Sequence, residues 1–203
     1  MTTATLRTDI AAWMNRTDLA PQMAGFIRIA ETRIALDVRS WQMVAPVTLT
    51  QTEGESNIPV PPDWLEWDSL TINDRDLDYV TMDVMRGFIR QGRTNSGNGG
   101  VYSMVGGLLI VAGEIATGSA DITVEATYYQ RIPALVNDAD TNWLLDTYPA
   151  LYLYACLASA CRFVKDDQRA SGYSDNYANL LADINSVAIK APKSGSQWRQ
   201  RAR

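Results

Sequence analysis

The first forty residues show apolar positions recurring with the period of an α-helix. A first helix is predicted by apolar side chains three or four residues apart, namely Leu6, Ile10, Trp13 and Met14. Thr5 or Thr8 is suited to cap its start. A polar break at residues 15–18 ends it, and Asp18 is the expected N-cap of a second helix that reaches about Arg39. This second helix presents one apolar stripe, formed by Met23, Phe26, Ile27, Ala30, Ile34 and Val38.

From about Met43 the pattern changes to short β-branched and apolar runs set among Thr, Pro and Gly, which favours strands and turns. Strands are predicted at residues 58–60, 70–72, 101–105, 108–111 and 122–129. The Gly106–Gly107 pair suits a tight hairpin turn. Thr81 is expected to cap a short helix, and residues 92–100 form a Gly-rich loop. The middle of the chain is therefore predicted to form a small antiparallel β module.

Three further helices are predicted after the β module. Thr141 or Asn142 is expected to cap a short helix, and Pro149 to start a longer helix that reaches about Lys165. Another helix covers about residues 168–189. The long helix carries small residues that allow close approach of a neighbouring helix, namely Ala155, Ala158, Ser159 and Ala160. The first two and last two helices are therefore predicted to pack as a bundle.

The predicted fold class is α+β: an antiparallel helical bundle with an inserted small antiparallel β module and an extended C-terminal tail. In this division residues 1–41 and 137–189 form a discontinuous helical bundle domain. Residues 42–136 form the inserted β-rich module, and residues 190–203 form a basic C-terminal tail.

The charge and composition of the sequence limit the class of protein to which the chain can belong. The net charge of the 203 residues is −5, but residues 190–203 hold five basic residues and no acidic one, which leaves −10 for the rest. We see no secretory leader and no apolar run of about 18 residues that could span a bilayer, so we expect a soluble protein made in a cytoplasm. Cys156 and Cys161 are five apart in a predicted helix, on different faces, and are expected to be buried free thiols.

No candidate for catalysis emerges. The chain has no histidine, which removes the commonest general base and a common metal ligand. The aspartates at 74, 76 and 78 have the opening spacing of a calcium loop, but Tyr79 and Met85 occupy the positions where that loop needs Gly and Glu, so a polar turn is the better interpretation. At the helix junction Asp166–Asp167, the second aspartate is the expected N-cap. We predict no catalytic, cofactor-binding or metal-binding residue and no enzymatic activity.

The tryptophans fall into two groups. Five lie among apolar neighbours and are expected in the core, namely Trp13, Trp41, Trp64, Trp67 and Trp143. Trp198 lies in the basic tail with nothing local to bury it, which favours an aromatic anchor on another protein. The five basic charges of the tail would bind DNA only weakly and without sequence preference.

Three segments, in order, resemble phage head-to-tail adaptor (connector) proteins of short-tailed phages. They are Asn-Arg-Thr-Asp-Leu at 15–19 with Phe26 and residues 30–34, Tyr128–Leu135 leading to Asp140, and the run from Asn142 through Pro149 to Tyr154. The resemblance covers residues 5–40 and about 128–165. It implies a structural virion protein at the head-tail junction, assembled in the cytoplasm of the host bacterium. Such adaptors form a ring, commonly of twelve copies, between portal and tail, and extend the DNA channel.

The resemblance also implies partners: the portal protein, tail nozzle or tail fibre proteins, and further copies of the chain, with genomic DNA only in transit and no membrane. Because the C-terminal extension of such adaptors often reaches the portal, the predicted portal-binding residues are Lys190, Lys193, Trp198, Arg199, Arg201 and Arg203. One alternative is a receptor- or glycan-binding module of the tail, suggested by Trp64, Trp67 and the Gly-rich loop. Another is a cell-wall hydrolase that uses carboxylates. No sequence motif in the chain supports either alternative.

Overall fold

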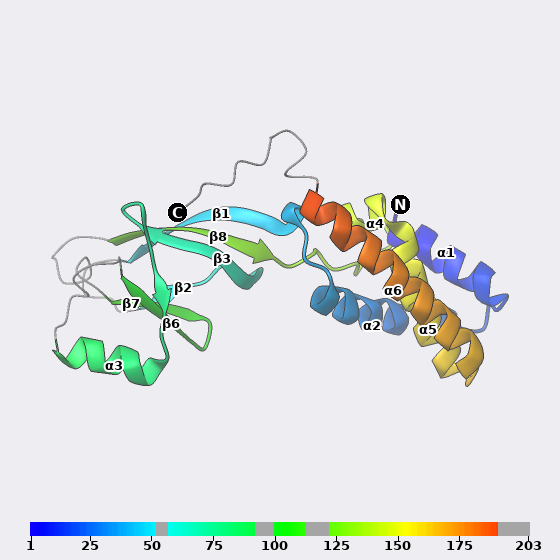
Figure 1. Cartoon of the computed structure of the whole chain (residues 1–203). Helices are drawn as coiled ribbons and strands as arrows, with labels where there is room; N and C mark the ends of the chain where they lie inside the picture. The colour runs from blue at the N-terminus through cyan, green and yellow to red at the C-terminus, as the bar shows by residue number, and fades with distance from the viewer. Residues whose placement is uncertain (52–56, 92–99, 113–121, 191–203) are drawn as a thin grey trace. The chain divides into compact units, whose positions relative to one another are not determined.

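The computed structural model describes residues 1–51, 57–91, 100–112 and 122–190 (Figure 1). The chain divides into two compact units. The helical unit comprises Met1–Gln42 and Ile132–Arg203, and the β unit comprises Met43–Arg131. The β unit is thus inserted between two stretches of sequence that fold together.

The helical unit is built around one central helix. Its α-helices are α1 (Thr3–Met14), α2 (Met23–Asp37), α4 (Trp143–Thr147), α5 (Pro149–Phe163) and α6 (Asp167–Lys190), with 3₁₀ turns at Ala20–Gln22 and, at its exit, Trp41–Met43. Helix α5 packs against α1, α2, α4 and α6. It is apolar nearly all round, as expected for a helix covered on several sides. Cys156 and Cys161 are free and buried in it, as predicted.

The starts of the first two helices differ from the prediction. Helix α1 is capped by Thr2 instead of Thr5 or Thr8, and the Thr5 side chain reaches back to the Thr2 backbone to complete a capping box. Asp18 accepts from Arg16 Nε at 2.9 Å, and a 3₁₀ turn with Pro21 in it precedes α2. Asp18 is not the cap, because this turn separates it from α2, whose preceding residue is Gln22.

The β unit contains two four-stranded sheets. The first has the order β1 (Val44–Gln51), β8 (Ile122–Gln130), β3 (Trp64–Ile72), β4 (Arg75–Asp76). The second has the order β2 (Ile58–Pro59), β7 (Leu108–Ala112), β6 (Val101–Val105), β5 (Asp78–Tyr79). Helix α3 (Met82–Gln91) follows β5. The β6–β7 turn is Gly106–Gly107, with φ of 58° and 81°, as the sequence predicted.

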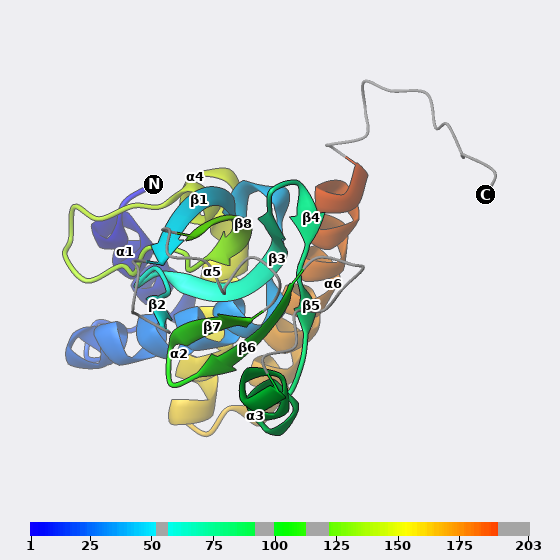
Figure 2. The ribbon, with the colours of Figure 1, turned by 90° about the vertical axis from the view of Figure 1, so that its left-hand side faces the viewer.

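The two sheets share one core, and Figure 2 shows them facing each other. Leu49 and Val124 of the first sheet lie in the same buried cluster as Ile58 and Leu109 of the second. The chain crosses between the sheets through Leu77, the single residue between β4 and β5. Helix α3 adds a second cluster, in which Met85 is fully buried against residues of β6 and β7.

The predicted fold, a helical bundle with a small antiparallel β module, is wrong. The described part of the chain contains six α-helices and two sheets of four strands each, and the β5–β6 pair is parallel. Strand β3 was recognised only over residues 70–72, because its first half carries outward-facing acids and two register shifts. Pro46 is tolerated in β1 because β1 is an edge strand. The predicted tail, apart from the last helical residue Lys190, lies outside the described residues.

Candidate functional site

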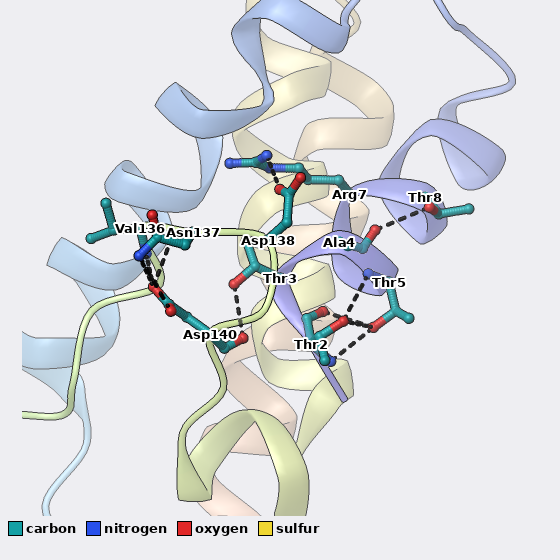
Figure 3. Close-up of polar contacts among 10 residues, drawn as sticks. All are labelled: Thr2, Thr3, Ala4, Thr5, Arg7, Thr8, Val136, Asn137, Asp138 and Asp140. Atoms are coloured by element: carbon teal, nitrogen blue, oxygen red, sulfur yellow. Dashed lines mark hydrogen bonds and ion pairs between the residues drawn. The ribbon is translucent and has the colours of Figure 1, made fainter.

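The start of α1 is held by the segment that connects β8 to α4, which we call the junction loop (residues 132–142). Figure 3 shows the contact of Thr3 with Asp140 and the ion pair of Arg7 with Asp138. The Thr3 N–H and Oγ1–H both donate to the Asp140 carbonyl oxygen at 3.0 Å, and the Ala4 N–H donates to the Asp138 carbonyl at 3.0 Å. Arg7 forms an ion pair with the Asp138 carboxylate. The loop therefore accepts from donors of the first helical turn that have no partner within the helix.

The Asp140 side chain shapes the junction loop itself. Its Oδ2 accepts from the backbone N–H groups of Asn137 at 2.7 Å and Val136 at 3.0 Å. These bonds lower the pKa of Asp140, chiefly through the Asn137 N–H. The carboxylate thus stays ionised and fixes the loop whose carbonyl oxygens hold α1.

Asn142 joins three parts of the helical unit through one side chain. Its Oδ1 accepts from the Leu145 N–H at 2.8 Å, which caps α4. Its Nδ2 donates to the Pro133 carbonyl at 2.8 Å and to the Tyr152 hydroxyl on α5 at 2.9 Å. Asn142 is 6% exposed and Tyr152 is 1% exposed, so the hydroxyl contact is shielded from water.

Glu31 of α2 completes the attachment of the junction loop. Its Oε1 accepts from the Leu135 N–H at 2.6 Å. Burial raises the pKa of Glu31, and the bond from Leu135 opposes that rise. Burial also raises the pKa of the Cys156 thiol, which leaves it unreactive. The Asn142–Tyr154 segment therefore contributes Asn142, Leu144, Leu145 and Tyr152 to the interior of the helical unit.

The aspartates with calcium-like spacing do not share a site. Asn73 and Asp74 have positive φ and form the β3–β4 turn, whereas Asp76 lies in β4 and Asp78 in β5. Asp166 accepts from the Arg169 N–H at 3.2 Å and so caps α6. The prediction that Asp167 is the cap is off by one residue.

The first sheet has an outer face lined by hydroxyl groups. A hollow of about 420 Å³ lies over β1, β3 and β8 and is lined by Pro46, Val47, Thr48, Ser69, Thr71, Glu125, Ala126 and Thr127. Among the described residues that line it there is no aromatic or cationic side chain. Trp67 instead packs on the core, with its Nε1–H donating to Met104 Sδ at 3.5 Å and its ring against Tyr128.

Two exposed apolar surfaces of the helical unit were missed by the sequence analysis. The aromatic face consists of Asp9, Trp13, Tyr154, Arg169 and Tyr173. Trp13, predicted in the core, is 49% exposed and stands edge-on to both tyrosine rings, with centroids 6.3 Å away. Trp41, also predicted in the core, is 52% exposed.

The second surface, the α2 face, consists of Gly25, Arg28, Ile29, Thr32 and Leu36. Ile29 is 58% exposed and Leu36 is 73% exposed. The signal was present in the sequence, because Ile29 and Leu36 fall outside the predicted apolar stripe of this helix. Two large aliphatic residues on the opposite side of a helix indicate a second covered face.

The predicted portal-binding residues lie almost wholly outside the described part of the chain. Lys190 ends α6 and its side chain is not described, and Lys193, Trp198, Arg199, Arg201 and Arg203 follow it. Within the described ranges, each helix is too short or too polar to cross a membrane.

Comparison with known proteins identifies the family. No curated protein sequence matches the chain. The family model described as SU10 adaptor protein matches residues 1–201, nearly the full length. This match includes all three segments that carried the resemblance to head-to-tail adaptors, and it confirms that resemblance. The chain therefore belongs to the SU10 adaptor protein family and is a structural adaptor protein of a phage.

Proposed function

We propose that the chain forms a ring between the portal and the tail, extends the DNA channel and performs no catalysis. The observation that carries this proposal is the family match over residues 1–201. It is supported by the Asn142–Tyr154 segment, whose buried side chains help to build the interior of the helical unit, among them Asn142 and Tyr152, which are joined by a hydrogen bond.

The charge of the chain suits a conduit for DNA. Residues 43–131 hold twelve acidic and five basic residues. An acidic wall repels phosphate groups, so DNA passes without being retained. We therefore propose that genomic DNA contacts the ring only in transit. We propose twelve copies, as in other rings of this kind.

The C-terminal tail is the proposed portal-binding element. Residues 190–203 combine five basic residues with Trp198 and contain no acid. Arginine side chains form bidentate pairs with carboxylates, and a tryptophan supplies a large apolar anchor. In this proposal Trp198 enters a pocket of the portal, while Lys190, Lys193, Arg199, Arg201 and Arg203 pair with its acidic residues. The opposite end of the ring meets tail nozzle or tail fibre proteins.

The proposal is tested by electron microscopy and mass photometry of the purified chain with the purified portal of the same phage. We expect a second ring stacked on the portal, whose mass gives the copy number. A chain that never decorates the portal at micromolar concentration refutes the proposed role.

The tail is tested separately by truncation after Lys190, which leaves α6 intact. A matched control replaces residues 191–203 with a Gly/Ser segment of equal length, and Trp198→Ala retains every charge. We expect the truncation and the control to lose portal binding alike, and Trp198→Ala to weaken it at least about tenfold. Undiminished binding by the truncated chain refutes the tail assignment but leaves the ring proposal standing.

A further inference from the structure

Helix α2 has an apolar surface that the fold of its own chain does not use. Its buried side includes Ile27, Ala30 and Ile34, each 1% exposed. Ile29 and Leu36 lie on the opposite side, about 20° apart around the helix axis at roughly 100° per residue. A helix that is apolar around its circumference is typical of one covered on both sides.

The α2 face also has room for a close neighbour. A Cβ atom added to Gly25 would meet nothing within 4 Å, so the fold of this chain does not require glycine there. Thr32 is small and exposed on the same side. Small residues between larger aliphatic ones let another surface approach the helix backbone closely.

The aromatic face is ordered before any partner binds. The Tyr154 and Tyr173 rings are stacked with an interplanar angle of 21° and a centroid distance of 6.4 Å. Arg169 donates to the Trp13 carbonyl oxygen at 3.2 Å, and its guanidinium lies 5.9 Å from the centre of the Tyr173 ring. Trp, Tyr and Arg are the residues most enriched at binding hot spots, and rigid ones lose little entropy on association.

The two faces are complementary in charge and share no helix. Arg28 is exposed on the α2 face, and Asp9 lies one helical turn from Trp13 on the aromatic face. Within the described ranges neither side chain has an ion-pair partner. Contact between like faces would bring two Arg28 or two Asp9 side chains together, whereas contact between unlike faces pairs them. Such a charge pair adds little affinity but sets the choice of partner.

We propose that the aromatic face of one copy packs against the α2 face of the next copy. Trp13 then covers Ile29 and Leu36, while Asp9 faces Arg28. The contact joins two different surfaces, so a pair of copies retains one free face of each kind, and repetition closes a ring when the rotation between copies permits. This inference rests on the proposed ring and names the surfaces that build it.

The test uses one variant for each face. Leu36→Glu places an acid on the α2 face opposite Trp13, and Trp13→Glu places an acid on the aromatic face opposite Ile29 and Leu36. Val187→Glu is the matched control, because Val187 is 49% exposed on α6 and belongs to neither face. Far-UV circular dichroism checks that each full-length variant is folded. We expect each face variant to weaken self-association at least about tenfold, and the control to behave as the unsubstituted chain.

Mixing the two face variants distinguishes this contact from a symmetric one. The intact α2 face of Trp13→Glu fits the intact aromatic face of Leu36→Glu, whereas contact between the other two faces would bring the two introduced glutamates together. The mixture is therefore expected to give a one-to-one heterodimer in sedimentation velocity, while each variant alone stays monomeric. Monomers in the mixture, or rings from either variant alone, overturn the proposal.

Crosslinking shows whether a negative result refutes the proposed contact or the proposed ring. Ala12→Cys and Thr32→Cys flank Trp13 and Leu36 respectively, and the native Cys156 and Cys161 are buried and do not compete. With a short bismaleimide we expect a crosslinked dimer only when both variants are present. Rings without this crosslink refute the interface and leave the proposed function intact. If the crosslinked dimer forms but no ring is seen, either with the chain alone or with the chain on the portal, the contact is supported and the ring is refuted.

Discussion

Loss of the Asn142 side chain is predicted to weaken the helical unit through several broken hydrogen bonds at once. Replacement by Ala removes the cap of α4, which costs about 1 kcal/mol. It also leaves the buried Tyr152 hydroxyl without the donor now 2.9 Å away, which costs about 1–1.5 kcal/mol. The third bond lost is the one from Asn142 Nδ2 to the Pro133 carbonyl oxygen. Because Pro133 is exposed, water can take the place of this donor, and the loss of the bond costs less than about 0.5 kcal/mol. The expected total for Asn142→Ala is about 2–3 kcal/mol.

Urea unfolding followed by circular dichroism at 222 nm measures this loss, since five of the six described α-helices belong to the helical unit. In a thermal scan the same loss corresponds to a decrease in Tm of roughly 4–12 °C. Asn142→Ser retains a capping oxygen and should recover about 1 kcal/mol. A double-mutant cycle of Asn142→Ala with Tyr152→Phe should give a coupling energy of about 1 kcal/mol. A loss below about 0.5 kcal/mol for Asn142→Ala would refute the reasoning.

Three further outcomes are expected. Burial raises the pKa of Glu31 above its ordinary value of 4.5, so the folded chain holds this proton more tightly and the contribution of Glu31 to stability falls as pH rises above 4.5. Glu31→Gln should remove that part of the pH dependence of urea unfolding, and an unchanged profile would contradict the assignment. A Cβ at Gly100 would lie 2.8 Å from Leu77 Cδ2, so Gly100→Ala should destabilise the β unit by about 1–3 kcal/mol, measured by near-UV circular dichroism on urea unfolding. Cys156 and Cys161 should react with a thiol reagent such as DTNB only after denaturation, and rapid reaction of the native chain would show that they are accessible.

Local sequence patterns predicted the positions of the helices well, but they predicted only some of the turns and helix caps. The Pro149 start of α5 and the Gly106–Gly107 turn depend on residues a few positions apart, and both were predicted correctly. The cap of α1 depends partly on Asp140, which is 137 residues from Thr3, and no local pattern contains that information. The same holds for the pairing of β1 with β8, whose partners lie far apart in the sequence.

The candidate sites show the same division between local and distant information. Helical periodicity predicts which face of a helix is apolar, and it placed Ile34 correctly in the core. Whether Trp13 is covered depends on how α1, α5 and α6 meet, and there the prediction of a buried ring was wrong. The tail assignment rests on charge, on Trp198 and on the resemblance to adaptors whose C-terminal extension reaches the portal, and it stays a prediction.

The most direct test of the adaptor role is complementation in vitro. DNA-filled heads and free tails are purified from a phage mutant that does not produce this chain, and the purified chain is then added. We predict that heads and tails join and that infectious particles appear only in the mixture that contains the chain. Heads and tails that join equally without it, or that never join when it is added, would contradict the account.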